Sequence, residues 1–118
     1  MSFSSLITPA QRLQLLQNGL AALIEGGQDP HPVVKLFCPA LNATWLLSEI
    51  DPEQPEIAYG LRFAGRGSPE LGYVDLRHLA KLAGRAETRI ERDADFQADQ
   101  PISVYAERSR AAGRIVEQ

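Results

Sequence analysis

The hydrophobic pattern near the N-terminus predicts an amphipathic helix. Its start is marked by Thr8, which can cap the backbone, by Pro9 in the first turn, and by Gln11, which completes a capping box. Gly26 and Gly27 mark its end. Apolar side chains recur inside the helix at a spacing that places them on one stripe, so we expect this stripe to pack on a sheet. The stripe comprises Leu13, Leu16, Leu20, Leu23 and Ile24.

The middle of the chain alternates between short apolar runs and sequences that form turns. Two prolines, Pro52 and Pro55, exclude a central strand between the second and third runs. The connections are too short for parallel crossovers, so neighbouring strands should be antiparallel. The expected strands are 33–37, 44–50, 57–63 and 71–74, with a weak one at 88–91.

Two more helices are expected. Asp75 can cap a short helix that stops at Gly84, and Pro101 opens a last helix that runs to about Ala112. The last helix carries a buried stripe of Ile102, Tyr105, Ala106 and Ser109. The fold class is therefore α+β: an antiparallel meander sheet of three to five strands with an N-terminal, a central short and a C-terminal helix. We expect residues 1–118 to form one domain with the last few residues frayed.

Composition narrows the class of protein. The chain has 118 residues, of which 44% are hydrophobic and 23% charged, as is typical of a globular domain. One cysteine cannot form an internal disulfide, and no apolar run is long enough to span a bilayer. The N-terminus lacks the pattern of a signal peptide. We therefore expect a cytoplasmic protein with no membrane contact and no cofactor.

The net charge of −3 conceals an acidic, basic, acidic order along the chain. Residues 1–61 hold two cations and six anions, residues 62–92 hold seven cations and four anions, and residues 93–118 hold three cations and five anions. Such asymmetry is explained either by ion pairs between the segments or by separate charged surfaces that bind partners.

Several runs of the sequence together resemble a known family. They are Pro32 to Phe37, Thr44 to Pro52, Ile57 to Leu61, Pro69 to Val74 and Glu91 to Asp93, followed by the helix that contains Tyr105 and Ala106. In this order they resemble the bacterial domain of unknown function 2958 family. The resemblance implies an accessory protein of plasmids, integrative elements or phages, sometimes encoded near anti-restriction genes. The family has no established activity, so the resemblance implies no catalytic residues.

Four carboxylates gather where the second strand should end: Glu49, Asp51, Glu53 and Glu56. Our first hypothesis is a non-catalytic binding module that uses this acidic patch to engage a protein partner, for example to block a host defence enzyme. The alternative is a solvated strand end in which Asp51 starts the turn.

The basic segment supports a second hypothesis, an accessory protein that binds nucleic acid. Its candidate phosphate contacts are Arg62, Arg66, Arg77, Lys81 and Arg85, of which the last three recur every four residues on one helical face. Aromatic residues for base stacking are not interleaved with these cations, which favours a solvated helix face instead.

A third, weaker hypothesis is a metal-assisted hydrolase that uses Glu49, Asp51 and Glu70. His31, Cys38 and His78 lack the close spacing of a zinc site, so we predict no metal site from them. Cys38 precedes a proline at a strand end, which is typical of a turn residue or a small hydrophobe.

Two residues in the strands have more than one interpretation. Strand alternation places Trp45 on the same face as Leu47 and Glu49, so Trp45 is either a core anchor or, if that face is exposed, an interface residue. Lys35 is the one charge inside an apolar strand, and we expect it to pair across the hairpin with Glu49 or Asp51.

Overall fold

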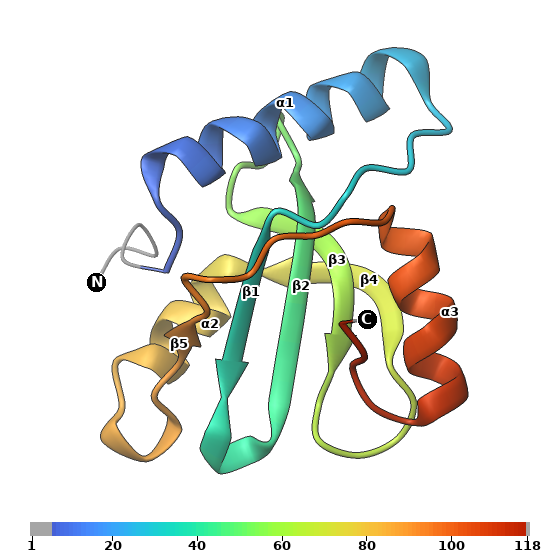
Figure 1. Cartoon of the computed structure of the whole chain (residues 1–118). Coiled ribbons are helices and arrows are strands. Elements are labelled where there is room, and N and C mark those ends of the chain that lie inside the picture. The colour runs from blue at the N-terminus through green and yellow to red at the C-terminus, as the bar shows by residue number, and fades with distance from the viewer. Residues whose placement is uncertain (1–5, 118) are drawn as a thin grey trace.

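The computed structural model describes residues 6–117 and confirms the α+β class (Figure 1). The elements are α1 (Pro9–Glu25), β1 (Val34–Cys38), β2 (Ala43–Ile50), β3 (Ile57–Phe63), β4 (Glu70–Asp75), α2 (Leu76–Ala83), β5 (Glu91–Arg92) and α3 (Ile102–Ala112). Two short 3₁₀ turns, η2 (Pro39–Leu41) and η3 (Ala86–Thr88), complete the described chain. The strands form one antiparallel sheet in the order β4-β3-β2-β1-β5, so the predicted meander is confirmed.

Helix α1 starts at the predicted capping box. The Gln11 backbone N–H donates to the Thr8 hydroxyl over 3.1 Å, and the Thr8 N–H donates to the Gln11 side chain over 2.9 Å. The helix crosses the top of the sheet in Figure 1, and Gly26 ends it. Its boundaries are therefore set by local sequence, as expected.

The predicted buried face of α1 is wrong. Leu15 and Gly19 are the buried residues of the helix. Asn18, on the same side, donates from Nδ2 to the Ser48 carbonyl over 2.9 Å and fixes the helix to β2. Of the predicted stripe, only Leu16 packs partly on the core. The other four side chains are 48–73% exposed: Leu13, Leu20, Leu23 and Ile24.

A β-bulge in β2 changes which residues share a face. Pairing with β3 shifts between Leu47 and Glu49, and Ser48 is the extra residue. The Ser48 hydroxyl, fully buried, donates to the Tyr59 carbonyl over 3.2 Å. Trp45 and Leu47 pack on the same cluster, so the expectation that they share a face is confirmed. Glu49 does not share that face, because strict alternation ends at the bulge.

Two apolar clusters cover the two faces of the sheet. One joins β1 and β2 to α1 and α2, and the other joins β2 and β3 to α3. The predicted stripe of α3 is confirmed, since all four of its residues are buried. Its first turn is held by Asp29, whose carboxylate accepts from the Ser103 N–H over 3.1 Å. The sequence does not predict this cap, because Asp29 lies 74 residues before Ser103.

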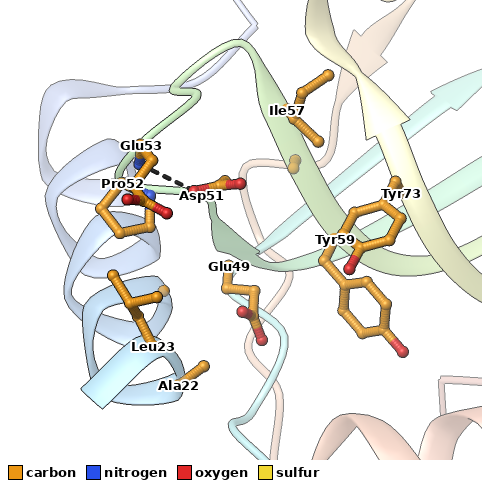
Figure 2. Close-up of a pocket in the computed structure, with 11 residues that line it drawn as sticks. Ala22, Leu23, Glu49, Asp51, Pro52, Glu53, Ile57, Tyr59 and Tyr73 are labelled. Atoms are coloured by element: carbon orange, nitrogen blue, oxygen red, sulfur yellow. Dashed lines mark hydrogen bonds between the residues drawn. The ribbon is translucent and has the colours of Figure 1, made fainter. Parts of the chain in front are cut away.

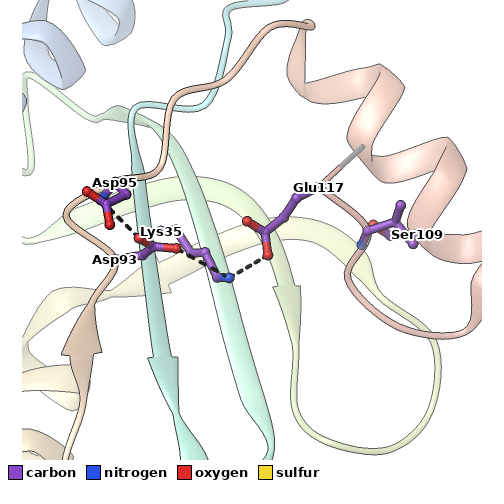
Figure 3. A network of polar contacts seen from close by, with 6 residues as sticks. Lys35, Asp93, Asp95, Ser109 and Glu117 are labelled. Carbon is purple, nitrogen blue, oxygen red and sulfur yellow. Dashed lines mark hydrogen bonds and ion pairs between the residues drawn. The ribbon is translucent and has the colours of Figure 1, made fainter.

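Lys35 forms its ion pairs with the C-terminal part of the chain (Figure 3). Its ammonium lies 3.7 Å from Asp93 and contacts Glu117. The predicted pair with Glu49 or Asp51 is wrong, because the register places Lys35 opposite Leu46.

Residues 115–117 contact the rest of the fold. Ile115 packs on the α3 cluster, and the Val116 N–H donates to the buried Ser109 hydroxyl over 2.9 Å. Through these contacts and the ion pair between Lys35 and Glu117, residues 115–117 lie against α3 and the sheet. Within residues 6–117, no helix combines the length and apolar character needed to cross a bilayer.

Candidate functional site

Three of the four carboxylates in the predicted acidic patch line one hollow at the end of the sheet (Figure 2). The hollow has a volume of about 230 Å³ and lies between α1 and the β2–β3 turn. Glu49, Asp51 and Glu53 form its acidic wall, and Tyr59 and Tyr73 face them. Leu23 of α1 closes the remaining side.

Asp51 has a structural task in this hollow. Its Oδ1 accepts from the backbone N–H groups of Glu53 and Gln54, over 2.8 and 3.4 Å. The Asp51 N–H also donates to the Ile57 carbonyl over 3.0 Å, which closes the turn. Asp51 therefore starts the turn, as the sequence allowed, and holds Glu53 at the rim.

Glu49 is the carboxylate of this hollow whose pKa is raised. Burial raises the pKa of its carboxyl above the ordinary value of 4.5, and the nearby negative charge of Asp51 raises it further. In the described part of the chain, neither Glu49 nor Glu53 has an ion-pair partner. The hollow is thus suited to receive a cation.

Glu56 lies apart from this hollow. Its carbonyl accepts from the Leu76 N–H over 2.8 Å, which fixes the start of α2 to the β2–β3 turn. Its charge contributes a little to the raised pKa of the Arg77 guanidinium, whose main partner is Asp75. Arg77 and Asp75 form a bidentate pair, with Nε and Nη2 at 3.1 and 3.0 Å from the two carboxylate oxygens.

The predicted basic stripe is not one continuous face. Arg77 is engaged by Asp75 at the start of α2, Lys81 is exposed in its last turn, and Arg85 lies beyond the helix end. Arg62 and Arg66 instead line a second hollow, of about 500 Å³. This hollow lies between the sheet and α2, away from the acidic one.

Trp45 supplies the aromatic wall of the second hollow. Its indole is half-buried, packs partly on the core and lines the hollow beside Arg62. The two residues are direct cross-strand partners, and Glu70 is the next residue in the same row. Trp45 is therefore neither fully core nor freely exposed, which resolves the two interpretations left open by the sequence.

Arg62 is held in a defined position at this hollow. Its Nη1 donates to the Tyr73 carbonyl over 3.0 Å. The guanidinium lies so close to Gly72 that a Cβ on that residue would be 3.0 Å from the Arg62 Cζ. A glycine inside a strand often marks such a close approach.

The carboxylates of the hydrolase hypothesis are not brought together. Glu70 lines the second hollow, whereas Glu49 and Asp51 line the first. Across residues 6–117, no three His, Cys, Asp or Glu side chains are grouped so that they could hold a metal ion. Cys38 is fully buried in the core, where it serves as the small hydrophobe that the sequence suggested.

Sequence reasoning missed the two tyrosines of the first hollow and the meeting of Trp45 with Arg62 at the second. Tyr59 and Tyr73 pair across β3 and β4, and their rings stack edge to face with centroids 5.5 Å apart. Trp45 meets Arg62 only because the bulge shifts the register of β2 by one residue. No local signal reveals a register shift of this kind before the strands are paired.

The comparison with family models decides the relationship suggested by the sequence. The model described as "Protein of unknown function (DUF2958)" matches residues 6–116. The chain belongs to the DUF2958 family. Searches of curated proteins and of solved structures found no match. Membership in DUF2958 confirms the resemblance and leaves the activity to be inferred from the two hollows.

Proposed function

We propose that this DUF2958 protein is a binding module that engages a protein partner through the acidic hollow and the exposed side of α1. One observation carries the proposal: Leu23 belongs to both features. It lines the acidic hollow and is 56% exposed within the apolar row of α1. We call the combined surface the α1 face. It comprises Leu13, Leu20, Leu23, Ile24, Glu49, Asp51 and Glu53.

An exposed apolar row of this kind is characteristic of an interaction surface. Ile24 is 73% exposed and Leu13 58%, although the helix has a second side that packs well. The row extends from Leu13 to Ile24, or about 16 Å along the helix axis. Contiguous apolar surface with a polar rim marks protein interaction sites. The α1 face fits the apolar side of a partner helix.

Charge complementarity defines the chemistry of that partner. Glu49 and Glu53 have no described ion-pair partner, and the rings of Tyr59 and Tyr73 stand opposite them. A lysine or arginine that enters the hollow would meet carboxylates and aromatic rings together. The proposed occupant is therefore a basic amphipathic helix of another protein. The accessory role implied by the family resemblance would make that protein a host factor, such as a defence enzyme.

The first test uses a defined probe. A helical peptide with leucines on one side and lysines on the other is titrated into the protein by isothermal calorimetry at low salt. We expect saturable binding that Leu20→Ser and Glu53→Lys each weaken at least about tenfold, because one removes apolar contact and the other inverts the charge. The control variant is Arg108→Ser, on the exposed side of α3.

Two further measurements make the proposal refutable. A photo-crosslinking amino acid at Leu20, and separately at Tyr73, should capture the same protein in expressing cells, and that protein should lose affinity for the two α1-face variants. Sedimentation should find a monomer. Capture of different proteins at the two positions, a dimer that Leu20→Ser dissociates, or peptide binding unaffected by both variants would refute the proposal.

A further inference from the structure

The second hollow, between α2 and the sheet, is independent of the α1 face and has a different chemistry. Besides Trp45, its apolar walls are Leu41, Phe63 and Leu82. Its polar lining is Arg62, Arg66, Ser68, Glu70 and His78. Its volume of about 500 Å³ lies within the range of small-molecule sites, which are concave, mostly apolar and equipped with a few polar groups.

The polar groups of this hollow are available for a ligand. Among the described residues, no hydrogen bond or ion pair engages the side chains of Trp45, Arg66, Glu70 or His78. Arg62 uses one of its five N–H donors on the Tyr73 carbonyl and keeps the others. Arg62, Arg66, Glu70 and His78 are exposed to solvent, so a ligand can reach them by replacing only the water that hydrates them.

Trp45, Arg62 and Arg66 together indicate which chemical class of ligand fits the hollow. An indole at the wall of a hollow stacks on planar aromatic rings, and two guanidinium groups bind phosphate through several N–H donors. The two arginines outnumber the single carboxylate, Glu70, so an anionic ligand is favoured. The side chains of Glu70 and His78 can then form hydrogen bonds with polar atoms at the edge of the bound ring.

We propose that this hollow binds a nucleotide unit, with the base against Trp45 and the phosphate at Arg62 and Arg66. The unit can come from a free mononucleotide or from a single strand of nucleic acid, since both offer the same base and phosphate. A base paired inside a duplex cannot enter the hollow, because both of its ring faces are stacked. Gly72 leaves room for the Arg62 guanidinium, since a Cβ there would lie 3.0 Å from its Cζ.

The chain contains a single tryptophan, so the fluorescence of Trp45 reports directly on the hollow. The probes are the four ribonucleoside monophosphates, adenosine, inorganic phosphate, a mixed-sequence single-stranded octamer and its duplex. We expect at least one monophosphate or the single strand to quench Trp45 saturably. We also expect adenosine to bind at least about tenfold more weakly than AMP, because it lacks the charge-assisted phosphate contacts.

Variants separate this site from nonspecific charge attraction. Arg66→Gln should weaken binding about tenfold, and Gly72→Ala should have a smaller effect, because its Cβ would shift the Arg62 guanidinium only slightly. The matched control is Arg89→Gln, an exposed cation of the same basic segment that does not line the hollow. Its affinity should stay within about twofold of the parent, since only distant charge is lost.

The remaining outcomes distinguish the sources and can overturn the proposal. Octamer binding that is much tighter than monophosphate binding and falls with salt identifies a single strand as the ligand. Equal or tighter binding of the monophosphate identifies the free nucleotide. Absence of quenching by every probe, equal affinity for the duplex, or equal losses in Arg66→Gln and Arg89→Gln would overturn the proposal. None of these results bears on the α1 face.

Discussion

Gly19 of α1 lies directly against the carbonyl of Ile50 at the end of β2. A Cβ on Gly19 would come within 1.8 Å of the Ile50 oxygen, so the two backbones touch with no side chain between them. The contact determines the rotation of α1. The side of the helix that carries a glycine approaches the sheet most closely, and the leucine-rich side is turned to solvent.

Replacement of this glycine provides the first prediction. Helix propensity alone would make Gly19→Ala stabilising by about 1 kcal/mol. The clash with the Ile50 carbonyl should reverse the sign, and we expect the free energy of unfolding to fall by about 2 kcal/mol or more. Gly84→Ala is the control, because its Cβ would meet no atom closer than 3.5 Å. Urea denaturation that shows Gly19→Ala to be as stable as Gly84→Ala would contradict the packing.

A pair of leucine substitutions tests the rotation of α1 independently. Leu15 is fully buried, so Leu15→Ala should lower the free energy of unfolding by about 2–5 kcal/mol through the cavity it leaves. Leu20 is 48% exposed, so Leu20→Ala should change it by less than about 1 kcal/mol. Thermal or urea unfolding of both variants decides the point. If the larger loss belonged to Leu20, the originally expected stripe would be the buried one.

The errors of sequence reasoning have a common physical origin. Helix boundaries, the order of β1 to β4 and the buried stripe of α3 follow from local signals, such as the Thr8 capping box, and all were predictable. The orientation of α1 and the faces of β2 depend on backbone contacts at Gly19 and on the extra residue Ser48. Neither contributes to a hydrophobic pattern, because one has no side chain and the other is polar.

The candidate sites follow the same division. The carboxylates of the β2–β3 turn were predictable because they are adjacent in sequence, and Glu49, Asp51 and Glu53 do share a hollow. The meeting of Trp45 with Arg62 was not, since it depends on a register that only the bulge creates. Functional residues that lie in one segment can be recognised in the sequence. Functional residues that meet across two strands can be recognised only when the register of the strands is known.

The raised pKa of Glu49 predicts a pH dependence of stability. Because the folded protein holds the Glu49 proton more tightly than the unfolded chain, stability from this group is present below the ordinary value of 4.5 and declines as the pH rises through the folded value. Glu49→Gln removes the penalty of a half-buried charge. We expect the variant to have a higher melting temperature than the parent at pH 7 and an equal one near pH 4. Asp51→Asn is unsuitable as a control, since it alters the turn.

The matched control for this experiment is Glu53→Gln. Glu53 is exposed at the rim of the same hollow, so its neutralisation relieves little burial. Melting curves recorded between about pH 4 and pH 7 should separate the two variants only above the ordinary carboxyl range. A Glu49→Gln advantage that is constant across this range would contradict the raised pKa.

Lys35 provides the last prediction, because one ammonium neutralises two carboxylates from distant parts of the chain. Its side chain is 17% exposed, and those of Asp93 and Glu117 are 30% and 37% exposed. Lys35→Met leaves these two acids close together without a cation, so we expect a loss of about 1 kcal/mol at low salt. Lys81→Met, on the exposed side of α2, is the control and should be nearly neutral. At about 1 M salt the difference between the two variants should narrow but persist, because partly buried charges in contact are screened much less than exposed ones. Equal stability of both variants at low salt would show that the C-terminal residues are held by Ile115 and Val116 alone.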